Sequence, residues 1–98
     1  MDTLDRRTLC PVCGHNFGFL PWSGNSASDE ICPSCGIQFG YDDSAGGDET
    51  ARQLIYRQWR QRWLTEGMQW SSRGRPRPPD WDPVIQLRQI GIDLPGPN

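Results

Sequence analysis

The sequence predicts a small α+β protein: a zinc ribbon extended by a tryptophan-rich helix and a short C-terminal helix. Two C-P-x-C-G motifs leave 18 residues between Cys13 and Cys32, each is followed by a short β-like stretch, and a helical apolar stripe comes next. The chain has 98 residues, of which 11 are glycine, 9 are proline and only 35% are hydrophobic. This composition predicts one loop-rich domain with a thin core, and it excludes a barrel or a Rossmann domain.

The two motifs carry all four cysteines of the chain, Cys10, Cys13, Cys32 and Cys35. Their spacing is typical of a two-pair zinc site. Two residues between paired cysteines let both sulfurs approach one cation at about 2.3 Å, and two such pairs complete a tetrahedron. Proline stiffens each turn, and the following glycine can take a positive φ. We therefore expect one Zn²⁺ per chain, held by these four cysteines in two knuckles.

Other uses of the cysteines remain open. They could form disulfides in three connectivities, but the N-terminal sequence has no secretory signal, so we expect the cytoplasm, where thiols stay reduced. A redox-active C-x-x-C motif is a further alternative, but it needs only one pair of cysteines, and this chain has two. The knuckles also resemble those of rubredoxin, an iron electron carrier, and iron fits the same four sulfurs. Zinc is the favoured ion.

His15, two residues after Cys13, is expected to be a turn or surface residue because four thiolates already saturate the metal.

The pattern divides the chain into three parts. Residues 1–47 are predicted to form the ribbon, with β-like stretches at 17–20 and 37–41 and a loop at 21–29. Residues 48–91 are expected to be a helical extension packed on the ribbon as one structural unit, and 92–98 a flexible tail.

Two helices are predicted in the extension. Asp48 is the expected N-cap of a helix from about 49 to 66, and Asp82 with Pro83 starts a second helix that runs to about 90. The first helix carries an apolar stripe that we expect to be core. Its members are Ala51, Leu54, Ile55, Trp59 and Trp63.

A proline-rich linker, residues 68–80, connects the two helices. We expect it to fold back and lay Trp70, its prolines and Trp81 on the body. Arg73, Pro76 and Pro79 also fit the R-x-x-P-x-x-P pattern of SH3 ligands, which is a weaker interpretation.

The residues around the second motif resemble bacterial cysteine-rich proteins of the CPCC type. Glu-Ile-Cys-Pro-Ser-Cys at 30–35 and Phe-Gly-Tyr-Asp-Asp at 39–43 carry this resemblance. The Pro-Pro-Asp-Trp-Asp-Pro stretch at 78–83 looks like related bacterial proteins of uncharacterised function. Val12 stands where the namesake motif has a further cysteine, and Gly36 where an aromatic is frequent. The resemblance implies zinc binding and adds no catalytic residue.

Charge is divided unevenly along the chain. Residues 1–50 hold eight acids and two arginines, a net charge of −6, whereas residues 51–98 hold eight arginines and four acids, a net charge of +4. We expect some helix arginines to pair with acids of the ribbon half, among them Asp42, Asp43, Asp48 and Glu49. These arginines are Arg52, Arg57, Arg60 and Arg62.

These features favour a non-enzymatic zinc-binding protein whose partner is another protein. A four-thiolate zinc site has no open position, and no nucleophile is paired with a base, so we expect no enzyme. No apolar run is long enough to cross a membrane. The second candidate is a nucleic-acid-binding ribbon that uses the four helix arginines, with or without those of the linker. The linker arginines are Arg73, Arg75 and Arg77. The third candidate is electron transfer through iron.

Overall fold

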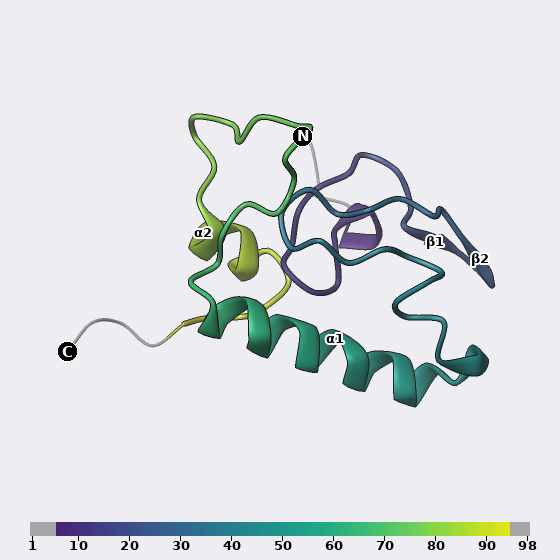
Figure 1. Ribbon diagram of the computed structural model, residues 1–98. Helices are drawn as coiled ribbons and strands as arrows, with labels where there is room; N and C mark the ends of the chain where they lie inside the picture. Colours follow the sequence, from purple (N-terminus) through teal and green to yellow (C-terminus); the bar gives the residue numbers. More distant parts are fainter. Residues whose placement is uncertain (1–5, 95–98) are drawn as a thin grey trace.

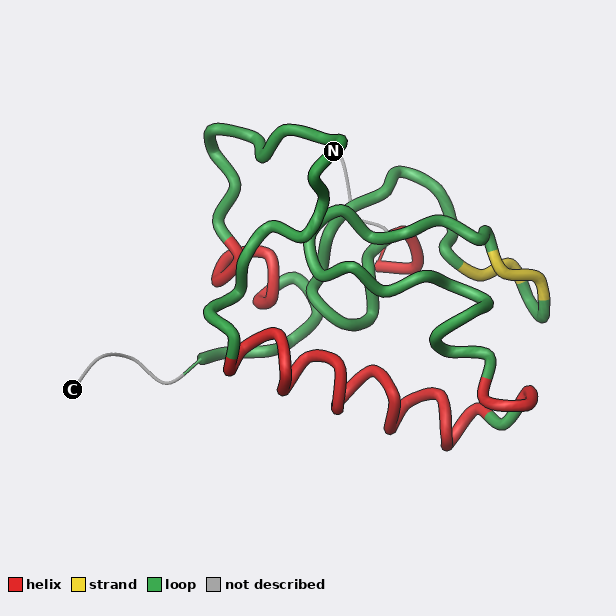
Figure 2. The backbone as a smooth tube through the Cα atoms, in the orientation of Figure 1, coloured by secondary structure: helices red, strands yellow, loops and turns green. Residues whose placement is uncertain are grey.

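The computed structural model describes residues 6–94, and it has a small α+β architecture (Figure 1). Its elements are η1 (Arg6–Thr8), β1 (Trp22–Ser23), β2 (Ser26–Ala27), η2 (Ala45–Gly47), α1 (Glu49–Thr65) and α2 (Pro83–Arg88). The strands form a two-stranded antiparallel sheet. Helix α1 runs along one side of the molecule, and most of the remaining chain is loop (Figure 2).

Both helices begin where the sequence predicts. The Asp48 side chain accepts hydrogen bonds from the backbone N–H groups of Thr50 and Ala51, which would otherwise lack partners in the first turn of α1. Asp82 caps α2 in the same way, with Pro83 in its first turn. Helix α1 ends at Thr65, close to the predicted end, while α2 ends at Arg88, two residues before the predicted one.

The prediction of strands directly after each knuckle is wrong. Residues 17–20 and 37–41 form no strand, and the one hairpin lies within 21–29, where a loop was expected. The reason is local: Gly18 and Gly40 have φ values of +77° and +91°, so the chain turns immediately after each aromatic residue. Only single bridges remain, Leu9 with Asn16 and Ile31 with Gln38.

The two bridges enclose two turns of the same construction, which we name the first cysteine turn (residues 10–14) and the second cysteine turn (residues 32–36). In the first turn the Cys10 N–H donates to the His15 carbonyl at 2.7 Å, and the Gly14 N–H donates to the Cys10 carbonyl at 2.8 Å. Cys32, Gly36 and Ile37 repeat this pattern with both distances 2.8 Å. The repeat extends to a shared Phe-Gly at 17–18 and 39–40, so one nine-residue pattern occurs twice, at 10–18 and 32–40.

Helix α1 packs on these turns through a face that differs from the predicted stripe. Trp63 is buried as expected, and Trp59 is half-buried, but Leu54 is 47% exposed. Tyr56 and Arg60 lie on the packed face instead, with Tyr56 only 3% exposed. The predicted stripe was misplaced because hydropathy alone ranks leucine above tyrosine and arginine. In the structure, the Tyr56 hydroxyl and the Arg60 guanidinium both have buried hydrogen-bond partners, so these side chains can lie on the packed face.

The chain after α2 returns to the core. The Ile92 N–H donates to the Leu87 carbonyl at 3.0 Å, and the side chains of Ile92 and Leu94 pack against the buried cluster. Residues 95–98, the rest of the predicted flexible tail, lie outside the described residues. Within 6–94, no helix has the length and apolar character needed to cross a membrane.

Candidate metal centre

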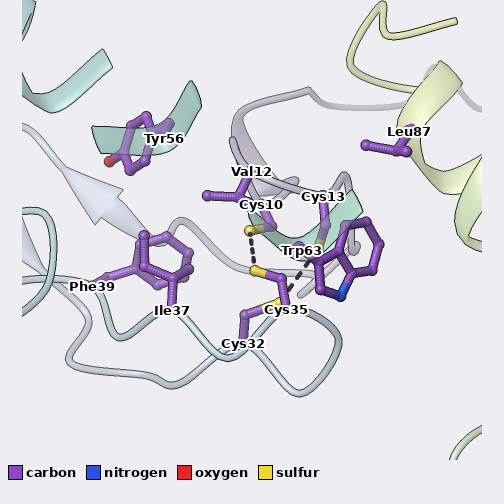
Figure 3. Close-up of a cluster of buried hydrophobic side chains, with 10 residues drawn as sticks. All are labelled: Cys10, Val12, Cys13, Cys32, Cys35, Ile37, Phe39, Tyr56, Trp63 and Leu87. Carbon is purple, nitrogen blue, oxygen red and sulfur yellow. Dashed lines mark hydrogen bonds between the residues drawn. The ribbon is translucent and has the colours of Figure 1, made fainter. Parts of the chain in front are cut away.

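The four cysteine sulfurs meet at one point between the two cysteine turns (Figure 3). All lie within 4.8 Å of one another, with Sγ–Sγ distances of 3.8 Å for Cys10 and Cys35 and 3.6 Å for Cys13 and Cys32. Four sulfurs placed tetrahedrally at 2.3 Å from a cation would be about 3.8 Å apart. The cluster can therefore hold one metal ion, with two ligands from each turn.

The close pairs cross from one turn to the other, and no disulfide joins them. All four cysteines are free, and the two close distances far exceed the S–S bond of about 2.05 Å. This arrangement favours a shared cation over the disulfide alternatives considered from the sequence.

Burial sets the chemistry of the sulfurs. Cys10, Cys13 and Cys32 have no exposed surface, and Cys35 is 7% exposed. Burial, together with hydrogen bonds to neighbouring cysteines, raises the pKa of the Cys10 and Cys35 thiols. Burial opposes the thiolate at Cys32 too, but hydrogen bonds from the other three sulfurs lower its pKa. Deprotonating all four of these buried groups therefore requires a cation to balance their charge.

Helix α1 holds both cysteine turns through two consecutive side chains. The indole N–H of Trp59 donates to the Cys35 carbonyl at 2.9 Å. The Arg60 guanidinium donates from Nε to the Val12 carbonyl and from a terminal nitrogen to the Pro11 carbonyl, each at 2.7 Å. One turn of helix therefore fixes the two pairs of sulfurs relative to each other.

Helix α2 closes the site from another side. The Gln86 amide donates to the Cys13 carbonyl at 3.1 Å and to the Ser34 hydroxyl at 2.9 Å, so it too joins the two turns. Gly14 permits this approach, because a Cβ at this position would collide with the Gln86 carbonyl, and its φ is +85°. The backbone N–H of Ser71 adds a bond to the Pro33 carbonyl at 3.0 Å.

His15 and the buried Asp43 lie outside the sulfur cluster. His15 packs its ring edge against Phe17, with ring centroids 4.9 Å apart. Asp43 is completely buried and accepts hydrogen bonds from the Tyr56 hydroxyl at 2.6 Å, the Trp22 indole at 2.8 Å and the Gly40 N–H at 2.6 Å. This carboxylate joins the hairpin to α1 and has no role at the sulfurs.

The helix arginines do not form one basic face. Arg52 stacks 3.9 Å above the Trp22 ring, donates to the Asp43 carbonyl, and pairs with Glu49 at 3.2 Å. Arg60 is occupied by the first cysteine turn. Arg57 and Arg62 are exposed. One of the four thus pairs with an acid that the sequence singled out, although that acid lies within α1 itself.

No family model matches the chain, and neither a curated protein nor a solved structure matches it. The resemblance to CPCC-type proteins therefore stays a prediction based on the motifs.

Trp59 was predicted to be core, but the roles of Arg60 and Gln86 in holding the turns were missed from the sequence. Arg60 follows Tyr56 and precedes Trp63 at helical spacing, so a stripe that admitted amphipathic side chains would have included it. Gln86 carries no local signal, because its partners are 73 and 52 residues away.

Proposed function

We propose that this protein is a non-enzymatic zinc protein in which Cys10, Cys13, Cys32 and Cys35 bind one Zn²⁺. The single observation that carries the proposal is the convergence of four buried, free sulfurs within 4.8 Å. Zinc accepts tetrahedral sulfur ligands without further geometric demands. The cytoplasm is the compartment that suits free thiols. On this proposal the two cysteine turns and the β1–β2 hairpin between them form a variant zinc ribbon.

The role of the ion is structural. Four thiolates leave tetrahedral zinc no open position for water or substrate, and the sulfurs are almost completely covered. Around them, α1 and α2 bind the carbonyls of the turns, so the ion, both turns and both helices stabilise one another. The ion thereby maintains a surface, and binding by that surface is the proposed activity.

The proposed partner is another protein. Large apolar side chains of the ribbon half are exposed: Phe19 by 43%, Ile31 by 57% and Tyr41 by 77%. Leu9, the counterpart of Ile31 before the first cysteine turn, is only 3% exposed. The two cysteine turns have the same backbone construction, but the residue before the first turn is buried and the residue before the second is exposed. This difference supports a protein contact at the second turn.

Removal of the metal tests the structural role. A strong chelator should unfold the chain, and zinc should restore it, because structural zinc contributes about 10 kcal/mol or more to folding in small domains. Circular dichroism and backbone NMR measure the change. A chain that keeps its dispersed spectrum after complete zinc removal would contradict the proposal.

A capture experiment from the source cell tests the partner. Holo-protein is immobilised beside a variant carrying Ile31→Ser and Tyr41→Ser, which alters exposed positions only. We expect one protein to be retained by the parent and lost with the variant. Equal retention by both would show that the exposed apolar residues bind no partner.

A further inference from the structure

The loop between the two helices carries a basic tip that has no role in the core. Every residue from 73 to 80 is exposed, and the loop projects beyond α2 at the top of Figure 1. The predicted contact with the body holds for Trp70 and Trp81, which are half-buried with ring centroids 5.5 Å apart, whereas the three prolines of the linker are exposed. The tip reads Arg-Gly-Arg-Pro-Arg at 73–77.

The tip is held in place although it is exposed. The Trp70 indole donates to the Arg75 carbonyl at 2.8 Å, and the Arg75 N–H donates to the Ser72 hydroxyl at 3.0 Å. The Ser72 N–H in turn binds the Pro33 carbonyl of the second cysteine turn at 2.9 Å. The candidate metal centre thus anchors the base of the loop and presents its tip to the outside.

Gly74 is not required by the fold. It is the one glycine within residues 6–94 that lacks a positive φ, and a Cβ there would meet nothing within 4 Å. Arg73, which precedes Gly74, and Arg77, three residues after it, have no hydrogen-bond or ion-pair partner among the described residues. Arg75 has one weak pair with Glu30, at 4.0 Å between two exposed side chains. Gly74 thus lies between Arg73, which has no partner, and Arg75, whose single pair is weak, and it leaves room for a ligand to approach the backbone closely.

We propose that this tip binds the minor groove of A·T-rich duplex DNA. The groove is only about 6 Å wide, so a residue without a Cβ lets the backbone approach its floor most closely. Its negative potential is strongest over A·T tracts, where inserted arginines are favoured. Arg73 and Arg75 flank Gly74 in the sequence and supply the positive charge that this potential favours, and Arg77 would add a contact to the phosphates.

The alternative is a protein groove that reads the prolines in polyproline II form. Such a groove recognises Pro76 and Pro79 and does not need glycine at 74.

The acidic part of the chain, with a net charge of −6 in residues 1–50, disfavours non-specific binding to DNA. DNA binding by this protein therefore depends on the tip alone, and we expect it to show a preference for A·T sequences.

Fluorescence anisotropy with two labelled duplexes of equal length, one all A·T and one all G·C, tests the proposal on the full zinc-loaded chain. We expect at least about fivefold tighter binding to the A·T duplex, the discrimination of roughly one recognised base pair. Distamycin, which fills the A·T minor groove, should displace the protein. Equal binding to both duplexes, equal binding to single-stranded RNA, or no binding at low salt overturns the proposal.

Gly74→Ala is the decisive variant, because it should fold like the parent. We expect an unchanged thermal midpoint and A·T binding weakened at least about fivefold. The double variant Arg73→Ala, Arg75→Ala should lower the slope of log K against log salt by about 2. Arg57→Ala, an exposed arginine on α1, is the matched control and should change binding by less than about twofold. Normal A·T binding by Gly74→Ala overturns the proposal.

Discussion

The guanidinium of Arg60 donates a hydrogen bond of 2.7 Å to the carbonyl of Val12, 48 residues earlier in the chain. Val12 lies between the cysteines of the first turn and has no exposed surface, so water does not reach this carbonyl readily. A basic residue that the sequence assigned to ion pairing or nucleic acid is instead part of the support for the sulfur cluster.

Arg60→Ala should destabilise the protein more than the substitution of any exposed arginine by alanine. Loss of two charge-assisted hydrogen bonds leaves the Pro11 and Val12 carbonyls without these partners, at a cost of about 2–4 kcal/mol. Arg57→Ala, on the exposed face of α1, should change the free energy of unfolding by less than about 0.5 kcal/mol. Urea unfolding of the zinc-loaded proteins measures both. Equal stability of the two variants would show that Arg60 contributes nothing to the turn.

The orientation of α1 gives a second prediction. Trp63→Ala removes a side chain that is 5% exposed and bonded to the Gln69 carbonyl, so it should cost about 3–5 kcal/mol. Leu54→Ala, at 47% exposure, should cost less than about 1 kcal/mol. Thermal unfolding distinguishes the observed face from the predicted stripe. A large loss at Leu54 would place that residue in the core and contradict the observed packing.

The Tyr56–Asp43 contact predicts a pH dependence. Burial, and then the hydrogen bond to Asp43, raise the pKa of Tyr56 far above its usual value of 10.0. The folded state therefore keeps the phenolic proton that the unfolded state loses, so the stabilisation is complete below pH 10 and is lost as the pH rises above it. The slope approaches about 1.4 kcal/mol per pH unit.

Tyr56→Phe isolates this effect because it cannot titrate. Between about pH 9 and about pH 11, the parent should lose roughly 1 kcal/mol more unfolding free energy than the variant. At neutral pH the variant should be less stable by about 1–3 kcal/mol, since Asp43 stays buried with one donor fewer. Parallel pH profiles for the two proteins would argue against the buried hydrogen bond.

The sequence was most informative where a local signal exists. The cysteine spacing predicted the cluster, and Asp48, Asp82 and Pro83 predicted the helix starts, because ligand pairs and caps depend on residues close in the chain. The strands were misplaced because Gly18 and Gly40 interrupt an apparently alternating pattern. The orientation of α1 and the role of Gln86 depend on partners many tens of residues away, which no periodicity encodes.

Elemental analysis of protein purified without added metal tests the central claim most directly, together with native mass spectrometry of the same sample. We predict about one zinc per chain, little iron, no visible colour, and loss of the zinc with folding in Cys32→Ser. A red protein with one iron per chain would replace the structural role by electron transfer. A metal content near zero in a folded protein with four oxidised thiols would contradict the account altogether.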